Sequence, residues 1–128
     1  MTLRDYFKRY GDAFEAYDAD AIAAHFALPA LFVRDGVTVP VDSREALMES
    51  VESLLALHRA WDVEKARVAH VTELESAPGH RIARVDWRLG RRLSRLGWTY
   101  ATTYVLVPDD TEDGWHIAAA LTHDAPFV

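Results

Sequence analysis

The residues of this chain that could do chemistry are tyrosines and histidines spaced among apolar residues. Tyr10 and Tyr17 fall on one stripe of a helix that apolar spacings of three and four predict from Leu3 onward, with Phe14 between them. A phenol on that stripe could donate a hydrogen bond to a ligand carbonyl, and a core tyrosine with a satisfied hydroxyl is the competing interpretation. Tyr10, Phe14 and Tyr17 are therefore candidate ligand contacts.

Two histidines stand at the ends of further predicted helices. His25 closes a short second helix, where the helix dipole favours a cation, and this alone could explain it. His58 closes the apolar stripe of a third helix that includes Leu54, and Trp61 follows three residues later. This spacing predicts a polar group beside an aromatic wall, with a partly exposed helix-end histidine as the alternative. His25, Leu54, His58 and Trp61 join the candidate contacts.

The last predicted strand supplies the strongest polar candidate. Strand alternation places four residues on one of its faces: Ile117, Ala119, Leu121 and His123. The three apolar residues should point inward for the core to close, which would put His123 at the end of a cavity. There it would either bond a neighbouring side chain or present a nitrogen to a ligand.

A charged set lies on an earlier strand. Asp86 alternates with Arg84 and Arg88, and the apolar residues between and beside them include Trp87. If the apolar set faces the helices, Trp87 lines the interior and the charged set faces solvent or a partner chain.

The composition excludes several kinds of site. The 128 residues include no cysteine, which rules out disulfides, thiolate metal ligands and a cysteine nucleophile. The histidines are not paired at metal-ligand spacing, and no phosphate-binding or dinucleotide motif is present, so we expect no metal and no cofactor. A net charge of −6 opposes binding to nucleic acid or an anionic membrane. The N-terminal stretch has no long apolar run, so the expected location is the cytoplasm.

The predicted elements form one α+β domain over residues 1–128. Helices come first, and the second should end because of Pro29. Asp35-Gly36 between two β-branched runs predicts a hairpin, and a third helix should begin at Asp42 or Ser43 and end before Trp61. Four longer strands then follow in meander order, over 63–74, 81–89, 98–107 and 115–123. Their joints are too short for crossover helices, which predicts a mainly antiparallel sheet of about five to six strands packed on three helices.

The N-terminal half carries a family resemblance. The run YGDAFEAYDADAI over 10–22, followed by His25-Phe26 and Pro29, resembles the opening of the nuclear transport factor 2-like superfamily, which includes SnoaL-like polyketide cyclases, ketosteroid isomerase, scytalone dehydratase and limonene epoxide hydrolase. The order of elements is also similar over the whole chain. The resemblance implies a cone, in which a curved sheet wraps the helices around a pocket, and dimerisation through the sheet.

The ketosteroid isomerase pattern fits only in part. Aligned without gaps, Tyr10 falls on the hydrogen-bonding tyrosine, Arg34 on the position of the aspartate base, and Thr103 near that of the protonated aspartate. Two of the three roles are missing, so steroid-type isomerisation is not expected. The same alignment places Thr103 on the pocket side and makes it a candidate contact.

Three functions follow as hypotheses. The favoured hypothesis is that the chain is a SnoaL-like protein whose pocket binds a small, largely apolar molecule without changing it chemically. The second is a cofactor-independent cyclase, isomerase or hydrolase that acts on such a ligand. The third is a dimerisation module with a vestigial pocket.

The expected core includes Phe14, Phe26, Leu54, Trp87 and Leu121. An outward row of Trp98, Tyr100, Thr102 and Tyr104 predicts a homodimer packed sheet against sheet.

Overall fold

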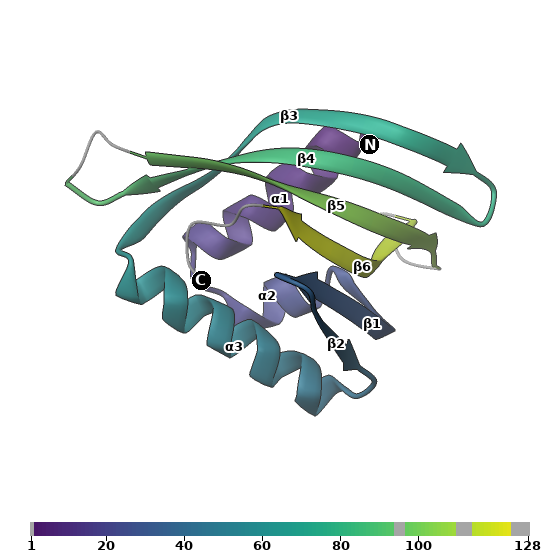
Figure 1. Cartoon of the computed structure of the whole chain (residues 1–128), viewed down its shortest axis with the longest axis horizontal. Coiled ribbons are helices and arrows are strands. Elements are labelled where there is room, and N and C mark those ends of the chain that lie inside the picture. The colour runs from purple at the N-terminus through teal and green to yellow at the C-terminus, as the bar shows by residue number, and fades with distance from the viewer. Residues whose placement is uncertain (1, 94–96, 110–113, 124–128) are drawn as a thin grey trace.

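Six strands form one sheet that curves over three helices in the computed structural model of the chain (Figure 1). The structure describes residues 2–93, 97–109 and 114–123. The strand order is β2-β1-β6-β5-β4-β3, and neighbouring strands are antiparallel except for β1 and β6, which are parallel. The predicted fold class, helices packed on a curved and mainly antiparallel sheet, is confirmed.

The first helix, α1 (Leu3–Glu15), forms where the apolar stripe predicts it. The Thr2 side chain accepts a hydrogen bond from the Asp5 backbone N–H, and the Asp5 carboxylate accepts one from the Thr2 backbone, which is a capping box. The helix ends before Tyr17, which has a positive φ of 54°. The predicted stripe therefore holds through Phe14, and Tyr17 lies beyond it.

Gly11 lets α1 lie close to the strand β3 (Val63–Ala77). A Cβ atom at this position would come within 2.6 Å of the Ala66 carbonyl oxygen, closer than real contacts allow. The absence of a side chain thus sets the distance between helix and sheet, and it brings the aromatic side of α1 against the sheet.

The second helix, α2 (Ala19–Ala23), is shorter than predicted. Asp18 caps it, but it ends before His25, and Pro29 lies within the strand β1 (Phe26–Arg34). The prediction that Pro29 stops this helix is wrong. A proline cannot donate to a strand ladder, and Pro29 lies where the pairing of β1 with β6 shifts register, so the strand accommodates it.

The predicted hairpin is confirmed. Strand β2 (Val37–Val41) pairs antiparallel with β1, and the turn residues Asp35 and Gly36 have φ angles of 51° and 77°. Positive φ at both central positions matches the turn that Asp-Gly favours. This tight turn fixes Arg34 at the end of β1, where it pairs with Val37.

The remaining elements follow the predicted order. Ser43 caps α3 (Arg44–Ala60), which ends immediately before Trp61 as expected. The strands β3, β4 (His80–Arg91), β5 (Gly97–Pro108) and β6 (Trp115–His123) then form a meander.

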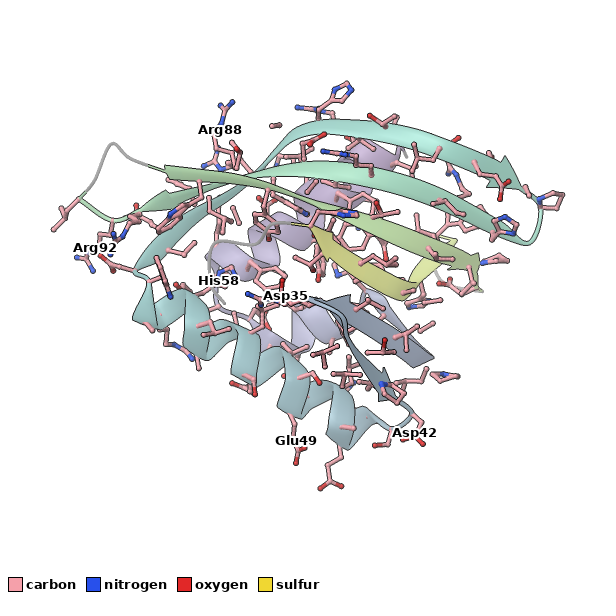
Figure 2. All side chains as sticks on the ribbon, viewed as in Figure 1. Asp35, Asp42, Glu49, His58, Arg88 and Arg92 are labelled. Atoms are coloured by element: carbon pink, nitrogen blue, oxygen red, sulfur yellow. The ribbon has the colours of Figure 1, made fainter. Side chains whose placement is uncertain are left out.

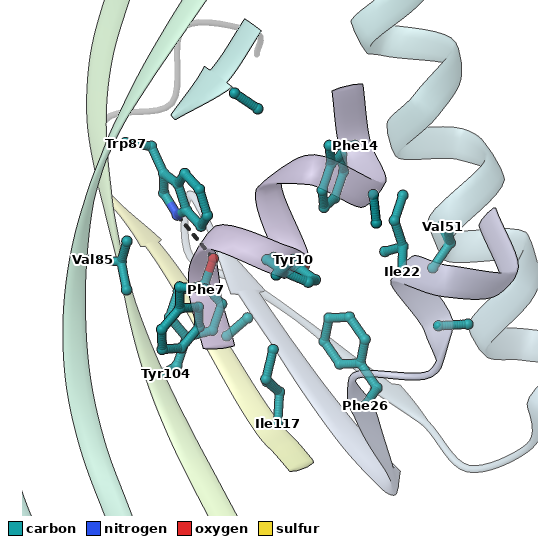
Figure 3. Close-up of a cluster of buried hydrophobic side chains, with 14 of the residues drawn as sticks. Phe7, Tyr10, Phe14, Ile22, Phe26, Val51, Val85, Trp87, Tyr104 and Ile117 are labelled. Atoms are coloured by element: carbon teal, nitrogen blue, oxygen red, sulfur yellow. Dashed lines mark hydrogen bonds between the residues drawn. The ribbon is translucent and has the colours of Figure 1, made fainter. Parts of the chain in front are cut away.

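The core lies between α1 and the concave face of the sheet and continues to α2 and α3 (Figure 3). Of the predicted core, Phe14, Phe26 and Trp87 are buried in this cluster, and Leu54 packs against it. The prediction for Leu121 is wrong, because that side chain is on the convex face, opposite the helices.

The prediction of an outward aromatic row on β5 is also wrong. Tyr104 and Thr102 are buried, and Tyr100 and Trp98 pack on the core side of the same strand. The neighbouring residue Thr103 faces the other way. A shift of one residue along a strand reverses its faces, and the gapless alignment was one residue out of step here.

Candidate functional site

A cavity of about 70 Å³ lies between α1, α3 and the concave face of the sheet. The helices and β3 contribute Tyr10, Phe14, Leu54, His58 and Ala66, and the other strands contribute Phe32, Arg34, Trp87, Leu89, Tyr100, Thr102, Tyr104, Ala120 and Thr122.

Two cross-strand rows build the sheet side of the cavity. Phe32, Ala120 and Tyr104 are successive partners across β1, β6 and β5, and they form an apolar row. The adjacent row on the same face is polar and consists of Arg34, Thr122 and Thr102. The parallel β1–β6 pairing therefore brings a cation from the first hairpin beside residues from the end of the chain.

Three tyrosines place phenol groups around this space. The Tyr104 hydroxyl accepts a hydrogen bond of 3.0 Å from the indole Nε1 of Trp87 (Figure 3). Among the residues that the structure describes, the hydroxyls of Tyr10 and Tyr100 have no hydrogen-bond partner. Burial raises the pKa of Tyr10 well above its ordinary value of 10.0, so this phenol stays protonated at physiological pH.

Arg34 brings the positive charge. Its side chain is 28% exposed, and its Nε lies 3.6 Å from the carboxylate of Asp35, which is 56% exposed. Burial raises the pKa of Tyr100, and the positive charge of the Arg34 guanidinium partly opposes this rise.

His58 reaches the cavity from the last turn of α3 and points toward the sheet (Figure 2). Its ring packs on Phe14 with 5.1 Å between the ring centroids. Burial lowers the pKa of His58 from 6.5 to about 4. The imidazole is therefore neutral at physiological pH, with one nitrogen that donates and one that accepts.

A wider groove of about 600 Å³ continues outward from the cavity between α3 and the β1–β2 hairpin. Cavity and groove share four lining residues, Phe32, Arg34, Leu54 and Thr122. The rest of the groove is lined by Val33, Asp35, Val37, Val39, Glu49, Ser50, Ser53 and Leu57. Arg34 thus stands at the junction of an enclosed chamber and an open groove.

Five of the residues chosen from the sequence line this cavity together: Tyr10, Phe14, Leu54, His58 and Trp87. They come from three different elements, and the helical stripes identified four of them. The polar group beside an aromatic wall, expected at His58, is present, although the aromatic partner is Phe14.

Three other candidates lie elsewhere. The Tyr17 hydroxyl donates to the Val63 carbonyl, at a separate surface groove. The Trp61 ring packs on Trp98, with 5.4 Å between centroids. The Nδ1 of His25 donates to the carbonyl of Ala21 at 2.8 Å, as the helix-end interpretation expects. Their predicted places in the cavity are wrong, because all three follow a helix end, where the chain turns away from the helical stripe.

His123 and Thr103 lie on the convex face of the sheet. His123 is exposed, and its Nε2 is 3.0 Å from the Thr103 hydroxyl. The prediction that both line the pocket is wrong. Leu106 pairs with Ile117 but Val105 pairs with Ala119, so β6 carries a bulge at Ala118. An extra residue in one strand reverses its faces from that point, and Ala120 and Thr122 face inward in place of Leu121 and His123.

The charged set of β4 faces outward, as the strand alternation predicts. Arg84 and Asp86 form an ion pair at 3.2 Å, and Arg88 projects from the convex side (Figure 2). Trp87 lies on the concave side and lines the cavity.

The sequence contained a signal for some of the residues that were missed. Trp98, Tyr100, Tyr104 and Leu106 alternate along β5, and this apolar period by itself favours the inward face that the structure shows. Arg34 had no such signal, since a charged residue after an apolar run is typical of a hairpin end. The bulge in β6 has no glycine or proline to mark it.

The arrangement suits recognition better than proton transfer. Among the described residues that line the enclosed cavity, none is aspartate or glutamate, and the position of the isomerase base holds Arg34. Acid–base catalysis normally needs a positioned acid and base.

The described part of the chain also contains no cluster of three histidine or acidic residues that could hold a metal ion. Within the same ranges, no helix has the length and apolarity needed to cross a bilayer.

Comparison with solved structures shows the same fold at low sequence identity. An NTF2-like protein with a cystatin-like fold from Novosphingobium aromaticivorans has 17% identity and a TM-score of 0.71, over 94% of this chain and 77% of its own. An NTF2-like protein of unknown function from Pseudomonas putida has 15% identity and a TM-score of 0.73, over 98% and 85%. A Xanthomonas campestris protein described as a calcium/calmodulin-dependent protein kinase II association domain has 14% identity and a TM-score of 0.69, over 98% and 87%.

No curated protein matches the chain at a significant level. A family model described as NTF2-like protein (DUF6841) matches residues 2–125, which is nearly the full length. Together with the six-stranded sheet wrapped around three helices, this match shows that the chain belongs to the NTF2-like family DUF6841.

Proposed function

We propose that this chain, as one domain over residues 1–128, binds a small, largely apolar molecule in the cavity and its groove without changing it chemically. The observation that supports this most strongly is the wall of the cavity, where aromatic and aliphatic side chains surround a few convergent polar groups. Ligand sites in proteins commonly have this composition.

The size of the site supports the same function. The enclosed chamber of about 70 Å³ is too small for most ligands alone, but the groove of about 600 Å³ continues it through four shared residues. Small-molecule sites typically measure about 300–1,000 Å³. A ligand would therefore place one apolar end in the chamber and the remainder along the groove beside α3.

Catalysis by a cyclase, isomerase or hydrolase mechanism has less support. The titratable group of the chamber nearest to neutrality is His58, and its pKa of about 4 makes it a weak base. The carboxylates of Asp35 and Glu49 line the open groove instead, where water reaches them. Binding without chemistry needs no such acid–base pair. The expected absence of a metal and a cofactor, and the cytoplasmic location, stay predictions from the sequence.

A homodimer through the sheet remains our proposal, with different residues at its centre. Across β1, β6, β5 and β4, one cross-strand row on the convex face is apolar and consists of Leu31, Ala119, Val105 and Ile82. Leu31 is 36% exposed, and Leu121 lies in the next row. A second copy would cover this surface. The association-domain description of one similar structure fits such pairing.

The binding proposal is tested with a neutral fluorescent probe, N-phenyl-1-naphthylamine. Ala120 and Ala119 are adjacent in β6 but face opposite sides of the sheet, so Ala120→Val narrows the chamber and Ala119→Val does not. We expect the probe to bind the wild type and the Ala119→Val variant, and to bind Ala120→Val more weakly. Equal binding to both variants, or no binding to the wild type, would contradict a ligand site in this cavity. Circular dichroism checks that each variant is folded.

A further inference from the structure

The tyrosine hydroxyls of this chain fall into two groups by their hydrogen bonds. Of the five tyrosines, Tyr6 donates to the His25 carbonyl at 2.9 Å, and Tyr17 donates to the Val63 carbonyl. The Tyr104 hydroxyl accepts a hydrogen bond from a buried indole. The other two hydroxyls have no hydrogen-bond partner in the described structure, and both of these residues line the chamber. The phenols without a protein partner are therefore gathered at the proposed ligand site.

These two phenols belong to different walls of the chamber. Tyr10 comes from α1 and is 6% exposed, and Tyr100 comes from β5. Burial raises the pKa of Tyr10, and the neighbouring phenols of Tyr104 and Tyr100 raise it further, so these groups lie within electrostatic reach of one another. Burial also raises the pKa of Tyr100. Both hydroxyls are protonated at physiological pH and can donate a hydrogen bond.

A buried hydroxyl without a protein partner costs free energy unless a ligand atom or a water bonds it. A carbonyl oxygen has two lone pairs and no hydrogen, so a single such atom can accept two hydrogen bonds. A pure hydrocarbon would fill the chamber but would leave both phenols unsatisfied. The donors of the chamber therefore favour a ligand that carries an acceptor oxygen into it.

The surroundings of the phenols favour a neutral acceptor over an anion. Aromatic and aliphatic side chains make up most of the chamber wall. The burial that keeps both phenols protonated also disfavours a negative charge on a ligand atom at the same place. The cation at the mouth of the chamber, Arg34, already lies 3.6 Å from the carboxylate of Asp35. A carbonyl group satisfies the donors without carrying a charge into the interior.

We propose that the ligand carries a neutral carbonyl group at the end that enters the chamber, and that its oxygen accepts hydrogen bonds from Tyr100 and Tyr10. This inference rests on the proposed binding function and names the chemical class of the ligand. The rest of the molecule is apolar and lies against Phe32 and Leu54, which line both chamber and groove. Tyr100 lies outside the three positions of the ketosteroid isomerase pattern, so that pattern does not predict this contact.

The test uses three probes of almost the same shape, each of which is titrated against bound N-phenyl-1-naphthylamine. They are the ketone 4-phenyl-2-butanone, its alkene analogue 2-methyl-4-phenyl-1-butene, and the carboxylate 3-phenylpropionate. We expect the ketone to bind the wild type about tenfold more tightly than the alkene, because the alkene cannot accept a hydrogen bond from the phenols. The carboxylate should bind more weakly than the ketone, because it would carry a charge into the chamber.

Two variants and one control assign the preference to the phenols. Tyr100→Phe and Tyr10→Phe each remove one donor and should each lose most of the preference for the ketone over the alkene. Tyr17→Phe removes a phenol hydroxyl that lies outside the cavity, and it should keep the preference. The ketone and the alkene are compared within each variant, so a change in the affinity for the naphthylamine itself cancels. Circular dichroism checks that each variant is folded.

The failures of this inference and of the binding function are distinguishable. If the naphthylamine binds the wild type but the ketone does not displace it better than the alkene, the carbonyl inference is overturned and the binding function stands. The inference is also overturned if Tyr17→Phe loses the preference as Tyr100→Phe does, or if the carboxylate binds more tightly than the ketone. If the naphthylamine does not bind the wild type, the binding function itself fails.

Discussion

Trp87 and Tyr104 are joined by a hydrogen bond of 3.0 Å from the indole Nε1 to the phenol oxygen, between the neighbouring strands β4 and β5. Both side chains are buried, and both line the cavity. The bond therefore holds two large side chains of the cavity wall in one arrangement, and it satisfies the N–H of a buried indole.

The first prediction concerns this bond. Tyr104→Phe removes the acceptor and leaves a buried N–H unsatisfied, which should lower the free energy of unfolding by about 1–3 kcal/mol. Tyr100→Phe, on the same strand face, removes a hydroxyl with no hydrogen-bond partner in the described structure and should cost less than about 0.5 kcal/mol. Urea denaturation measures both values. Equal losses for the two variants would contradict the role of the Trp87–Tyr104 bond.

The second prediction concerns pH. Burial holds the pKa of His58 near 4, below the value of 6.5 in an unfolded chain, so between these values the unfolded chain takes up a proton that the folded chain does not. The contribution of the neutral His58 side chain to the free energy of unfolding is therefore fully present above pH 6.5. It is lost as the pH falls toward 4, at up to about 1.4 kcal/mol per pH unit.

The His58→Phe variant isolates this effect, because it keeps a ring of similar shape beside Phe14 and removes the titration. The difference in unfolding free energy between wild type and variant should shift in favour of the variant as the pH falls from 6.5 to 4. Chemical denaturation at several pH values gives both curves, and parallel curves would show that His58 is not held neutral by burial.

The third prediction concerns the contact of α1 with β3. A glycine inside a helix normally costs about 1 kcal/mol relative to alanine. We expect Gly11→Ala to destabilise the protein instead. The new Cβ would meet the Ala66 carbonyl oxygen at 2.6 Å and force the helix outward, which should lower the free energy of unfolding by about 1–3 kcal/mol. Gly79→Ala, where a Cβ has open space, is the control and should be nearly neutral. A stabilised Gly11→Ala variant in thermal denaturation would refute this packing.

The fourth prediction concerns the core. Phe14→Ala should lower the free energy of unfolding by about 3–5 kcal/mol, since Phe14 is buried between His58 and Tyr10. Leu121→Ala, on the convex face, should cost clearly less in the monomer. A loss below about 1 kcal/mol for Phe14→Ala would contradict the placement of α1.

The fifth prediction concerns association. Sedimentation should show a dimer of the wild type at micromolar concentration, and Val105→Glu, at the centre of the apolar convex row, should shift it to monomer. Tyr104→Glu, at a residue of the predicted outward row that is in fact buried, would instead place a charge in the core and unfold the chain. A monomeric wild type would remove the dimer proposal and leave the binding proposal unaffected.

The sequence predicts the elements of this fold well and the faces of its strands less well. Helical stripes repeat over many residues, so Tyr10, Phe14, Leu54 and His58 could be assigned to the interior from spacing alone. Strand alternation depends on an unbroken period of two. The bulge at Ala118 shifts that period by one residue, which moved the best candidate, His123, to the surface.

The site residues on the far strands required pairing information. Arg34 and Thr122 become neighbours because β1 lies parallel to β6, and such a long-range pairing leaves no local pattern in either segment. The apolar period of β5 alone predicts the inward face of Tyr100, whereas the gapless alignment to a remote relative predicts the opposite face.

The parallel pairing of β1 with β6 also has a consequence for how the protein assembles. The first hairpin has no link to the rest of the sheet except through β6, the last strand of the described chain. Contacts between segments so distant in sequence form slowly, since a long loop must close first. Until β6 inserts between β1 and β5, the row from Arg34 through Thr122 to Thr102 is interrupted and the cavity has no sheet-side wall there. The cavity wall is thus complete only after β6 has paired with both β1 and β5, and a chain shortened before β6 would lack Ala120 and Thr122 of that wall.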